Sequence, residues 1–258
     1  MKIYRCPKCN ANLKGKEDKL ICEYCKSKFN GEEYIQDMDV KYIIPFNISK
    51  KEAKKIYNKR LKSILIPDKF KNIKLNKKLK SIYIPVYIYN LDASGELEFE
   101  GSKISTWKSS GKKYKKSDAY KIIRSGNLNI ENMPILLTGQ LNDIKDIEPY
   151  SFNNLERFDT KFLKNFKVYL PDKTEKEIII SIKEKVRQIF IDEVNKTIKG
   201  YDEKNIKEDS INLYNSSKKY ALIPIWLLNV DYNKKKYTFM INRSEERRVG
   251  KECRSRWS

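Results

Sequence analysis

The stretch Cys6-Pro7-Lys8-Cys9, followed by Cys22-Glu23-Tyr24-Cys25, decides the fold of the first thirty residues. Two thiols three positions apart on a tight turn grip an ion from one side, and a second such turn supplies the other side. The spacing is typical of two metal-binding knuckles joined by a short β-hairpin. It predicts one zinc ion held by four cysteines, Cys6, Cys9, Cys22 and Cys25. Four thiolate ligands leave no coordination position for water, so the predicted role of the zinc is structural.

Redox chemistry and an iron site are the alternatives for these cysteines. A redox C-x-x-C motif normally stands beside a βαβ pattern, and none is recognised here. Rubredoxin-like iron uses the same tetrahedron, but its cysteine pairs are normally much farther apart. Knuckles usually place glycine directly after the second cysteine, where this chain has Asn10 and Lys26. Asparagine tolerates the left-handed backbone of that position well, and lysine tolerates it less well.

The composition indicates a folded chain. Among 258 residues, 40% are hydrophobic and 12% are aromatic, which is enough to build a core and argues against wholesale disorder. No apolar run approaches the roughly 18 residues needed to span a bilayer. No apolar segment of a signal peptide precedes the first cysteine. Paired thiols in a chain without export signals favour a reducing compartment, so we expect a cytoplasmic protein.

The formal net charge of +21 has two explanations. Clustered cations neutralise phosphates and release counterions, so the charge predicts a polyanion partner. The alternative is base composition, because the chain is rich in Lys, Ile, Asn and Tyr, as expected from an AT-rich genome. Lysine outnumbers arginine by 45 to 10, whereas base readout and phosphate forks favour arginine. Both explanations stay open at this point.

The positive charge is concentrated in three places. The ribbon, residues 1–30, holds eight basic and three acidic residues. Residues 50–80 hold 13 basic and two acidic residues, and residues 112–116 are four lysines around one tyrosine, flanked by Trp107 and Tyr120. Basic residues interleaved with aromatics suit single-stranded nucleic acid, although a solvated loop has the same composition. The candidate polyanion contacts are Lys54, Lys55, Lys59, Arg60, Lys62, Lys112, Lys113, Lys115 and Lys116.

The chain is predicted to be α+β, with a small β zinc ribbon over residues 1–32 and an α+β domain over residues 40–242. Ser49 and Glu52 form a capping box that starts a helix, and Ile66-Pro67 ends it. A long helix is predicted from about residue 172, ending before Gly200. Strands are predicted at 42–46, 81–91, 95–100 and 103–107, with a strand-pair region at 120–130. Residues 131–171 show no clear period, so no element is predicted there.

Two segments of the larger domain resemble each other. Ile84–Leu91 reads IPVYIYNL and Ile223–Val230 reads IPIWLLNV, and a turn and a second strand are expected after each. The sequence therefore predicts two similar Pro-anchored β-hairpins, which suggest a duplicated α+β unit. Chance similarity among strands rich in Ile and Tyr is the alternative. Proline lacks a backbone donor and so favours the first residue of a strand or a sheet edge.

The last sixteen residues, 243–258, differ in composition from the rest. They contain five of the ten arginines in the chain and interrupt what should be a continuing sheet. We interpret them as a foreign, artefactual tail and exclude them from the fold prediction. Cys253, the fifth cysteine, is then not a metal ligand.

Catalytic motifs are not found in the sequence. There is no histidine, which removes the Ser-His-Asp and Cys-His arrangements and His-ligated catalytic zinc. No glycine-rich phosphate loop is present. Glu96, Glu98 and Glu100 share one face of a strand, but their alternation with Leu97 and Phe99 indicates a solvated sheet face. We therefore predict a protein that is not an enzyme; the alternative is an enzyme with a carboxylate- or lysine-based site in the 40–242 domain.

The N-terminal motifs CPKC and CEYCKSKF resemble a TFIIB-type zinc ribbon. The later segments YIIPFNISKKEA (from Tyr42), IYIPVY, STW (from Ser105) and YALIPIWLLN (from Tyr220) are similar to a family of TFIIB-type zinc ribbon-containing proteins widespread in Firmicutes. The resemblance extends over residues 5–242. It implies zinc at the four paired cysteines and brings no catalytic residues. Family members often carry a second, N-terminal ribbon, which this chain lacks, and continue their sheet where this chain enters residues 243–258.

These observations predict a non-enzymatic adaptor in which one structural zinc ion stabilises the N-terminal ribbon. We expect it to recognise nucleic acid or a protein partner through the ribbon and the basic surface.

Overall fold

The computed structural model has an α+β fold, as the sequence predicts. It describes residues 6, 8–9, 11, 13–16, 19–30, 39–61, 79–139, 141, 150–164, 166–232 and 235–241. Lys62 and the predicted tail at 243–258 lie outside these residues. In chain order, the elements are β1 (Leu13–Lys16), β2 (Lys19–Cys22), β3 (Lys28–Asn30), β4 (Tyr42–Ile43), α2 (Lys50–Leu61), β5 (Leu79–Ser109), β6 (Lys112–Leu136), β7 (Glu156–Arg157), the 3-10 helix η4 (Thr160–Leu163), β8 (Lys167–Val168), α3 (Glu175–Thr197), β9 (Glu203–Tyr232) and β10 (Lys235–Ile241).

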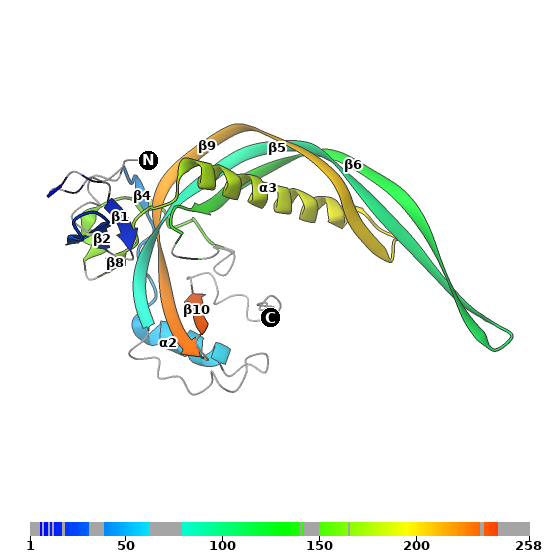
Figure 1. The fold of residues 1–258 in the computed structure, drawn as a ribbon, viewed down its shortest axis with the longest axis horizontal. Helices are drawn as coiled ribbons and strands as arrows, with labels where there is room; N and C mark the ends of the chain where they lie inside the picture. Colours follow the sequence, from blue (N-terminus) through cyan, green and yellow to red (C-terminus); the bar gives the residue numbers. More distant parts are fainter. Residues whose placement is uncertain are drawn as a thin grey trace. The chain divides into compact units, whose positions relative to one another are not determined.

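The chain divides into two compact units. The first comprises Met1–Ile88, Pro134–Glu175 and Lys219–Ser258, and the second comprises Tyr89–Met133 and Lys176–Lys218. The long strands β5, β6 and β9, which are labelled in Figure 1, contribute residues to both units. No helix among the described residues is long and apolar enough to cross a membrane.

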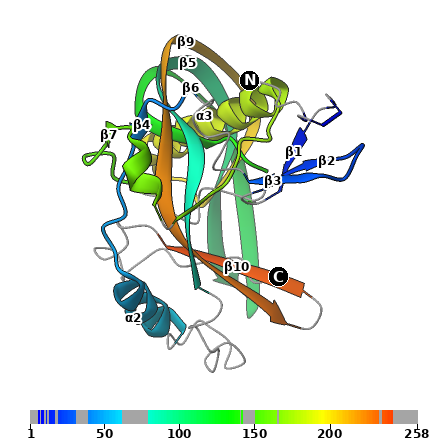
Figure 2. The same cartoon turned by 90° about the vertical axis from the view of Figure 1, so that its left-hand side faces the viewer.

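The first unit contains two sheets. The smaller has the order β1-β2-β3, and both of its pairings are antiparallel (Figure 2). In the larger, β9 pairs in parallel with β4 and antiparallel with β10, while β5 pairs in parallel with β8. Burial along β5 is nearly continuous from Ile82 to Val86, as expected where a strand is covered on both faces.

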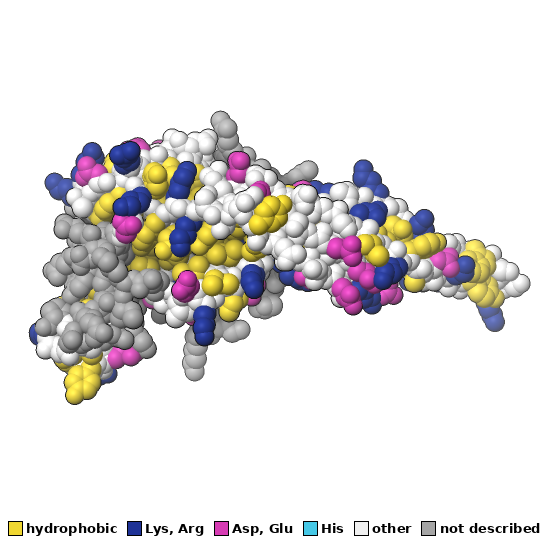
Figure 3. All heavy atoms as spheres, turned by 90° about the horizontal axis from the view of Figure 1, so that it is seen from above, with side chains coloured by type: hydrophobic (Ala, Val, Ile, Leu, Met, Phe, Trp, Pro, Cys, Tyr) yellow, Lys and Arg dark blue, Asp and Glu magenta, His cyan; other side chains and the backbone are white. Residues whose placement is uncertain are grey.

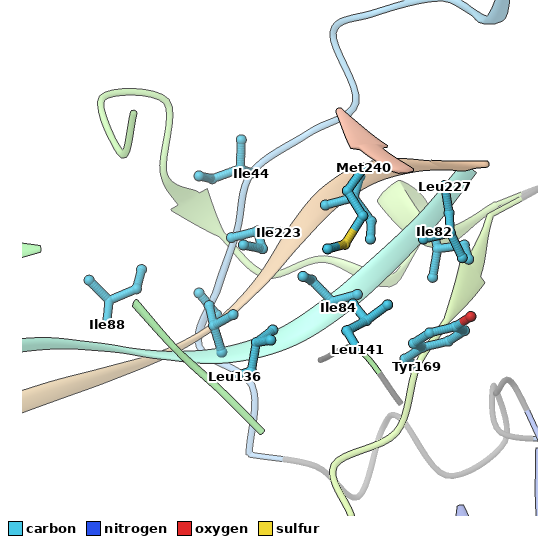
Figure 4. Packing of buried hydrophobic residues seen from close by; sticks show 13 residues of the cluster. Ile44, Ile82, Ile84, Ile88, Leu136, Leu141, Tyr169, Ile223, Leu227 and Met240 are labelled. Atoms are coloured by element: carbon cyan, nitrogen blue, oxygen red, sulfur yellow. The ribbon is translucent and has the colours of Figure 1, made fainter. Parts of the chain in front are cut away.

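The main core of the first unit lies between its strands. Figure 4 shows Ile82 and Ile84 of β5 gathered with Ile223 and Leu227 of β9 and with Met240 of β10. All five side chains are at most 4% exposed. Aromatic rings from the part of the chain for which no element is predicted, among them Tyr150 and Phe152, pack against this core.

The two Pro-anchored segments have equivalent surroundings. A short parallel strand pairs with the residues three and two positions before each proline: β8 with Ile82 and Tyr83, and β4 with Ala221 and Leu222. Pro85 and Pro224 lie inside β5 and β9, rather than at a first residue or a sheet edge as expected. Proline has no backbone N–H to donate. The strands tolerate this because each proline lies two residues beyond the last residue that pairs with the short parallel strand.

The helix α2 begins with the predicted capping box. The Ser49 backbone N–H donates to the Glu52 carboxylate over 2.7 Å, and the Glu52 N–H donates to the Ser49 hydroxyl over 3.3 Å. The Ser49 hydroxyl also donates to the Glu52 carboxylate over 2.6 Å, and this bond together with the one from the Ser49 N–H lowers the pKa of Glu52. Ala53 and Tyr57 form the buried stripe of the helix. A buried hydrogen bond then fastens α2 to β9, because the Tyr57 hydroxyl donates to the Trp226 carbonyl over 2.8 Å.

Replacement of Tyr57 with phenylalanine is expected to lower the free energy of unfolding by about 1 kcal/mol or more. The ring would stay in place, but the Trp226 carbonyl would lose a buried donor. Urea unfolding followed by circular dichroism measures the difference. Tyr214→Phe is the control, because Tyr214 is 41% exposed and its hydroxyl can bond to water. Equal stability of the Tyr57→Phe protein and the unchanged protein would contradict the assigned hydrogen bond.

The second unit consists of three strand segments, in the order β6-β5-β9, and α3, which lies along one face of them (Figure 1). Side chains of β5 alternate here between buried and accessible, with Leu97 and Phe99 buried. On α3, the buried side chains are Ile178, Val186, Phe190 and Ile191. Arg187 of α3 also pairs with Asp209 of β9 over 2.6 Å. A sheet covered on one face by a helix gives this alternation.

The predicted turn between residues 91 and 96 is not present, because β5 continues through Asp92-Ala93-Ser94-Gly95. These residues have the composition of a turn, but they contact both neighbouring strands, β6 and β9. The Asp92 carboxylate accepts hydrogen bonds from Asn129 over 2.7 Å and Asn215 over 3.0 Å. A Cβ atom on Gly95 would lie 2.4 Å from the Ser210 carbonyl oxygen. The first Pro-anchored segment therefore turns at Ser110-Gly111 instead, where β5 gives way to β6.

The three glutamates of β5 pair with neighbouring side chains on the accessible face of the strand. Glu96 accepts a hydrogen bond from the Ser125 hydroxyl over 2.8 Å, and Glu98 pairs with Lys121 over 2.6 Å. Glu100 pairs with Lys207 of β9. Such cross-strand pairs are typical of a solvated sheet face.

Candidate metal centre

The four paired cysteines converge on one point at the end of the small β1-β2-β3 sheet. Their sulfur atoms all lie within 4.8 Å of one another. The Sγ atoms of Cys6 and Cys25 are 3.6 Å apart, and those of Cys9 and Cys22 are 3.4 Å apart. All four are free thiols. This is the one group of three or more ligand-bearing side chains found in the described part of the chain, and it can hold a metal ion.

Backbone hydrogen bonds set the positions of the two cysteine pairs. The Cys6 N–H donates to the Ala11 carbonyl over 2.8 Å, and the Cys22 N–H donates to the Ser27 carbonyl over 3.0 Å. The Cys25 N–H points at the Cys22 sulfur, 3.4 Å away. Lys26 has a φ of 58°, so it adopts the left-handed conformation that glycine usually supplies after a knuckle. Asn10, the other residue in such a position, lies outside the described residues.

The pKa values of Cys25 and Cys9 are shifted in opposite directions. The contact with the Ser27 hydroxyl, 3.3 Å from the sulfur, is the largest effect that lowers the pKa of Cys25 to about 6. The backbone hydrogen bond with Ala11 lowers the pKa of Cys9, but partial burial and the three neighbouring sulfurs outweigh it and raise that pKa to about 12. Thiolates this close repel one another, so all four ionise together at neutral pH only around a cation.

One side of the cysteine cluster is buried against the larger sheet. Cys6 and Cys22 are 2% and 0% exposed, whereas Cys25 is exposed. The same apolar cluster contains Ile43 of β4 and Leu222 of β9. Its remaining buried members are Leu13, Leu20, Val40, Tyr83, Val168 and Leu170. The two buried ligands are therefore held by packing as well as by their own turns.

Comparison with known proteins finds similarity to a protein that is itself uncharacterized. The uncharacterized protein YdjG of Bacillus subtilis (strain 168) is 24% identical over 217 residues, which are 83% of this chain and 64% of that protein. No family model matches the chain. No solved structure matches it either. The resemblance to TFIIB-type zinc ribbon proteins therefore stays a prediction.

The candidate polyanion contacts fall into two separate groups. Lys54, Lys55, Lys59 and Arg60 lie on α2, in the first unit. Lys55 and Lys59 are exposed there, and Lys54 is half-buried. The four lysines at 112–116 are all exposed and lie on β6, in the second unit. Residues 112–116, for which the sequence leaves open a nucleic-acid groove or a solvated loop, are thus the start of strand β6.

Two side-chain contacts near these sites could not be predicted from the sequence. Ser27 contacts the sulfur of Cys25, but a serine two residues after a cysteine carries no signal of that contact. Trp107 and Tyr114 stack on each other across the β5–β6 hairpin. The seven-residue separation of these two rings becomes meaningful only when the turn between them is known.

Proposed function

We propose that this chain is a non-enzymatic cytoplasmic adaptor whose residues 1–32 form a zinc ribbon around one structural Zn²⁺. Residues 40–242 form the α+β platform, and the basic surface recognises nucleic acid or a protein partner. The observation that carries the proposal is the convergence of four cysteine sulfurs within 4.8 Å of one another.

The sulfur separations support zinc. A Zn–S bond of about 2.3 Å gives a regular tetrahedron whose sulfur–sulfur edges are about 3.8 Å. The Cys6–Cys25 and Cys9–Cys22 separations of 3.6 and 3.4 Å are close to this value. The Cys25 N–H directed at the Cys22 sulfur would stabilise negative charge on a ligating thiolate. Four thiolates in a reducing compartment are the ligand set that structural zinc prefers.

A structural role follows from the number of ligands. Four protein thiolates fill the tetrahedron, so the ion would have no position for an activated water. In the second unit, Glu98, Glu100 and Asp209 each pair with a cation, so these three carboxylates lie in ion pairs between neighbouring elements. The alternative, a carboxylate- or lysine-based enzyme in the 40–242 domain, is favoured by no particular contact among the described residues.

Metal analysis tests the proposal directly. Inductively coupled plasma mass spectrometry of the full-length protein, purified without added metal, is expected to give one zinc per chain. Iron in place of zinc, or less than half an equivalent of zinc after refolding with excess ZnCl₂, would contradict the proposal. A Cys9→Ser protein measured alongside is expected to retain almost no zinc, since Cys9 supplies one of the four ligands.

A further inference from the structure

The end of the β5–β6 hairpin is a separate exposed surface. We define it by residues 105–116. Its turn is Ser110-Gly111, with φ values of 51° and 76°. Two consecutive residues at positive φ make a type I′ turn, whose twist matches that of the two strands it joins. The turn fixes the pairing, so side chains on the two strands project in register.

Two aromatic rings dominate one face of the hairpin end. Trp107 and Tyr114 are stacked with their ring centroids 5.7 Å apart and an interplanar angle of 14°. They remain 48% and 42% exposed, respectively. Aromatic surface that packs in pairs and still faces water is a platform on which another flat ring can stack.

Lysines are concentrated along the hairpin end that carries this aromatic pair. The hairpin end contains Lys108, Lys112, Lys113, Lys115 and Lys116 and no acidic residue. Because side chains alternate along a strand, Lys112 and Lys116 share the face of Tyr114. In the described part of the chain, only Lys116 of this group pairs with a carboxylate, that of Asp118 at 2.8 Å. Figure 3 shows hydrophobic side chains next to Lys or Arg side chains at the right-hand end of this view.

We propose that the hairpin end binds single-stranded nucleic acid. Unpaired bases would stack on the Trp107–Tyr114 pair, and the lysines would contact the phosphates. A base-paired duplex hides the faces of its bases, so the rings would add little to duplex binding. Lysine is a point charge without the fork of arginine, so the contact would carry little sequence specificity.

The order of residues along the hairpin disfavours an anionic membrane as the partner. The outermost residues are Lys108, Ser109, Ser110, Gly111 and Lys112, and the aromatic rings lie behind them. Insertion of the rings into a bilayer would first carry polar and charged side chains into the apolar layer, at a large cost in free energy. The phosphates of a dissolved nucleic acid would contact the same lysines without that cost in free energy.

This inference rests on one part of the proposed function, namely that the basic surface binds a partner. It does not require the zinc ion. Fluorescence anisotropy of a labelled 20-nucleotide oligo(dT), titrated with full-length protein at several salt concentrations, tests it. Trp107→Ala/Tyr114→Ala is expected to weaken binding about tenfold or more. Tyr214→Ala, which removes another exposed aromatic ring of the second unit, is expected to leave binding unchanged.

A charge variant gives an independent readout. Lys112→Gln/Lys116→Gln, which changes the two lysines on the face of Tyr114, is expected to flatten the slope of log affinity against log salt by about 1.4, since each lost phosphate contact contributes roughly 0.7 for single strands. Lys176→Gln/Lys183→Gln on α3 makes the same change in net charge at exposed positions of the same unit and is expected to leave the slope unchanged.

Three results would overturn the inference: no oligo(dT) binding at 50 mM salt, binding that both hairpin variants leave intact, or hairpin-dependent binding to phosphatidylglycerol vesicles in place of oligo(dT). Zinc content measured on the same samples separates this inference from the proposed function. Loss of binding with one zinc per chain retained would identify the hairpin alone as the cause. If the unchanged protein takes up no zinc even after refolding with ZnCl₂ but still shows hairpin-dependent binding, the zinc proposal is contradicted and this inference stands.

Discussion

Substitution of Cys22 by serine is expected to abolish zinc binding and unfold β1, β2 and β3, while α3 and the long strands stay folded. Cys22 is fully buried, and its sulfur lies 3.4 Å from that of Cys9. Structural zinc contributes on the order of 10–16 kcal/mol in small zinc peptides. A sheet of strands with three or four residues each has no core large enough to replace that contribution.

Metal analysis and limited proteolysis measure the two parts of this result. We expect zinc to fall from one equivalent to near zero and trypsin to cleave rapidly within the first 30 residues. The melting temperature of the remainder should also decrease, because Cys22 shares an apolar cluster with Ile43 and Leu222. Cys253→Ser is the matched control and should leave zinc content unchanged. Loss of the α3 helical signal in Cys22→Ser would show that residues 40–242 do not fold independently of the ribbon.

Substitution of Gly95 by alanine is expected to destabilise the protein by about 2–3 kcal/mol. The new Cβ would lie 2.4 Å from the backbone oxygen of Ser210 and 3.1 Å from the Cα of Ile211. Backbone atoms cannot rotate away as a side chain can, so β5 and β9 would have to separate locally. Chemical denaturation measures the change in the free energy of unfolding.

Gly126→Ala is the matched control for this substitution. Gly126 also lies in a long strand, β6, but a Cβ atom there would meet nothing within 4 Å. Alanine loses less conformational entropy on folding than glycine, so Gly126→Ala should be neutral or stabilising by roughly 0.5 kcal/mol. Equal effects of the two substitutions would mean that β5 and β9 do not approach as closely at Gly95 as described.

Local signals explain which parts of the fold the sequence predicts well. The capping box at Ser49 needs only the residues up to Glu52, and the helix α3 needs only its own apolar spacing. The cysteine cluster is equally local, because two C-x-x-C turns and one short hairpin bring the four sulfurs together. Each of these features is complete within a few turns or strands of neighbouring sequence.

Pairing between distant strands explains what the sequence does not show. Asp92 and Gly95 have the composition of a turn, but Asn129, Asn215 and Ser210 from other strands determine their extended conformation. The candidate binding surface has the same origin, since the Trp107–Tyr114 stack depends on the position of the turn. Tyr150 and Phe152 show no period because irregular segments, not a helix or strand, carry them to the core.

Pro85 and Pro224 also bear on how the chain avoids misfolding. Strands as long as β5 and β9, with 31 and 30 residues, can in principle pair in several registers whose energies differ little. A slip of β8 or β4 by two residues would place the proline in the paired segment, where a backbone donor is needed that proline does not have. Each proline therefore disfavours alignments in which its short parallel neighbour is shifted onto it, and the chain has this arrangement twice.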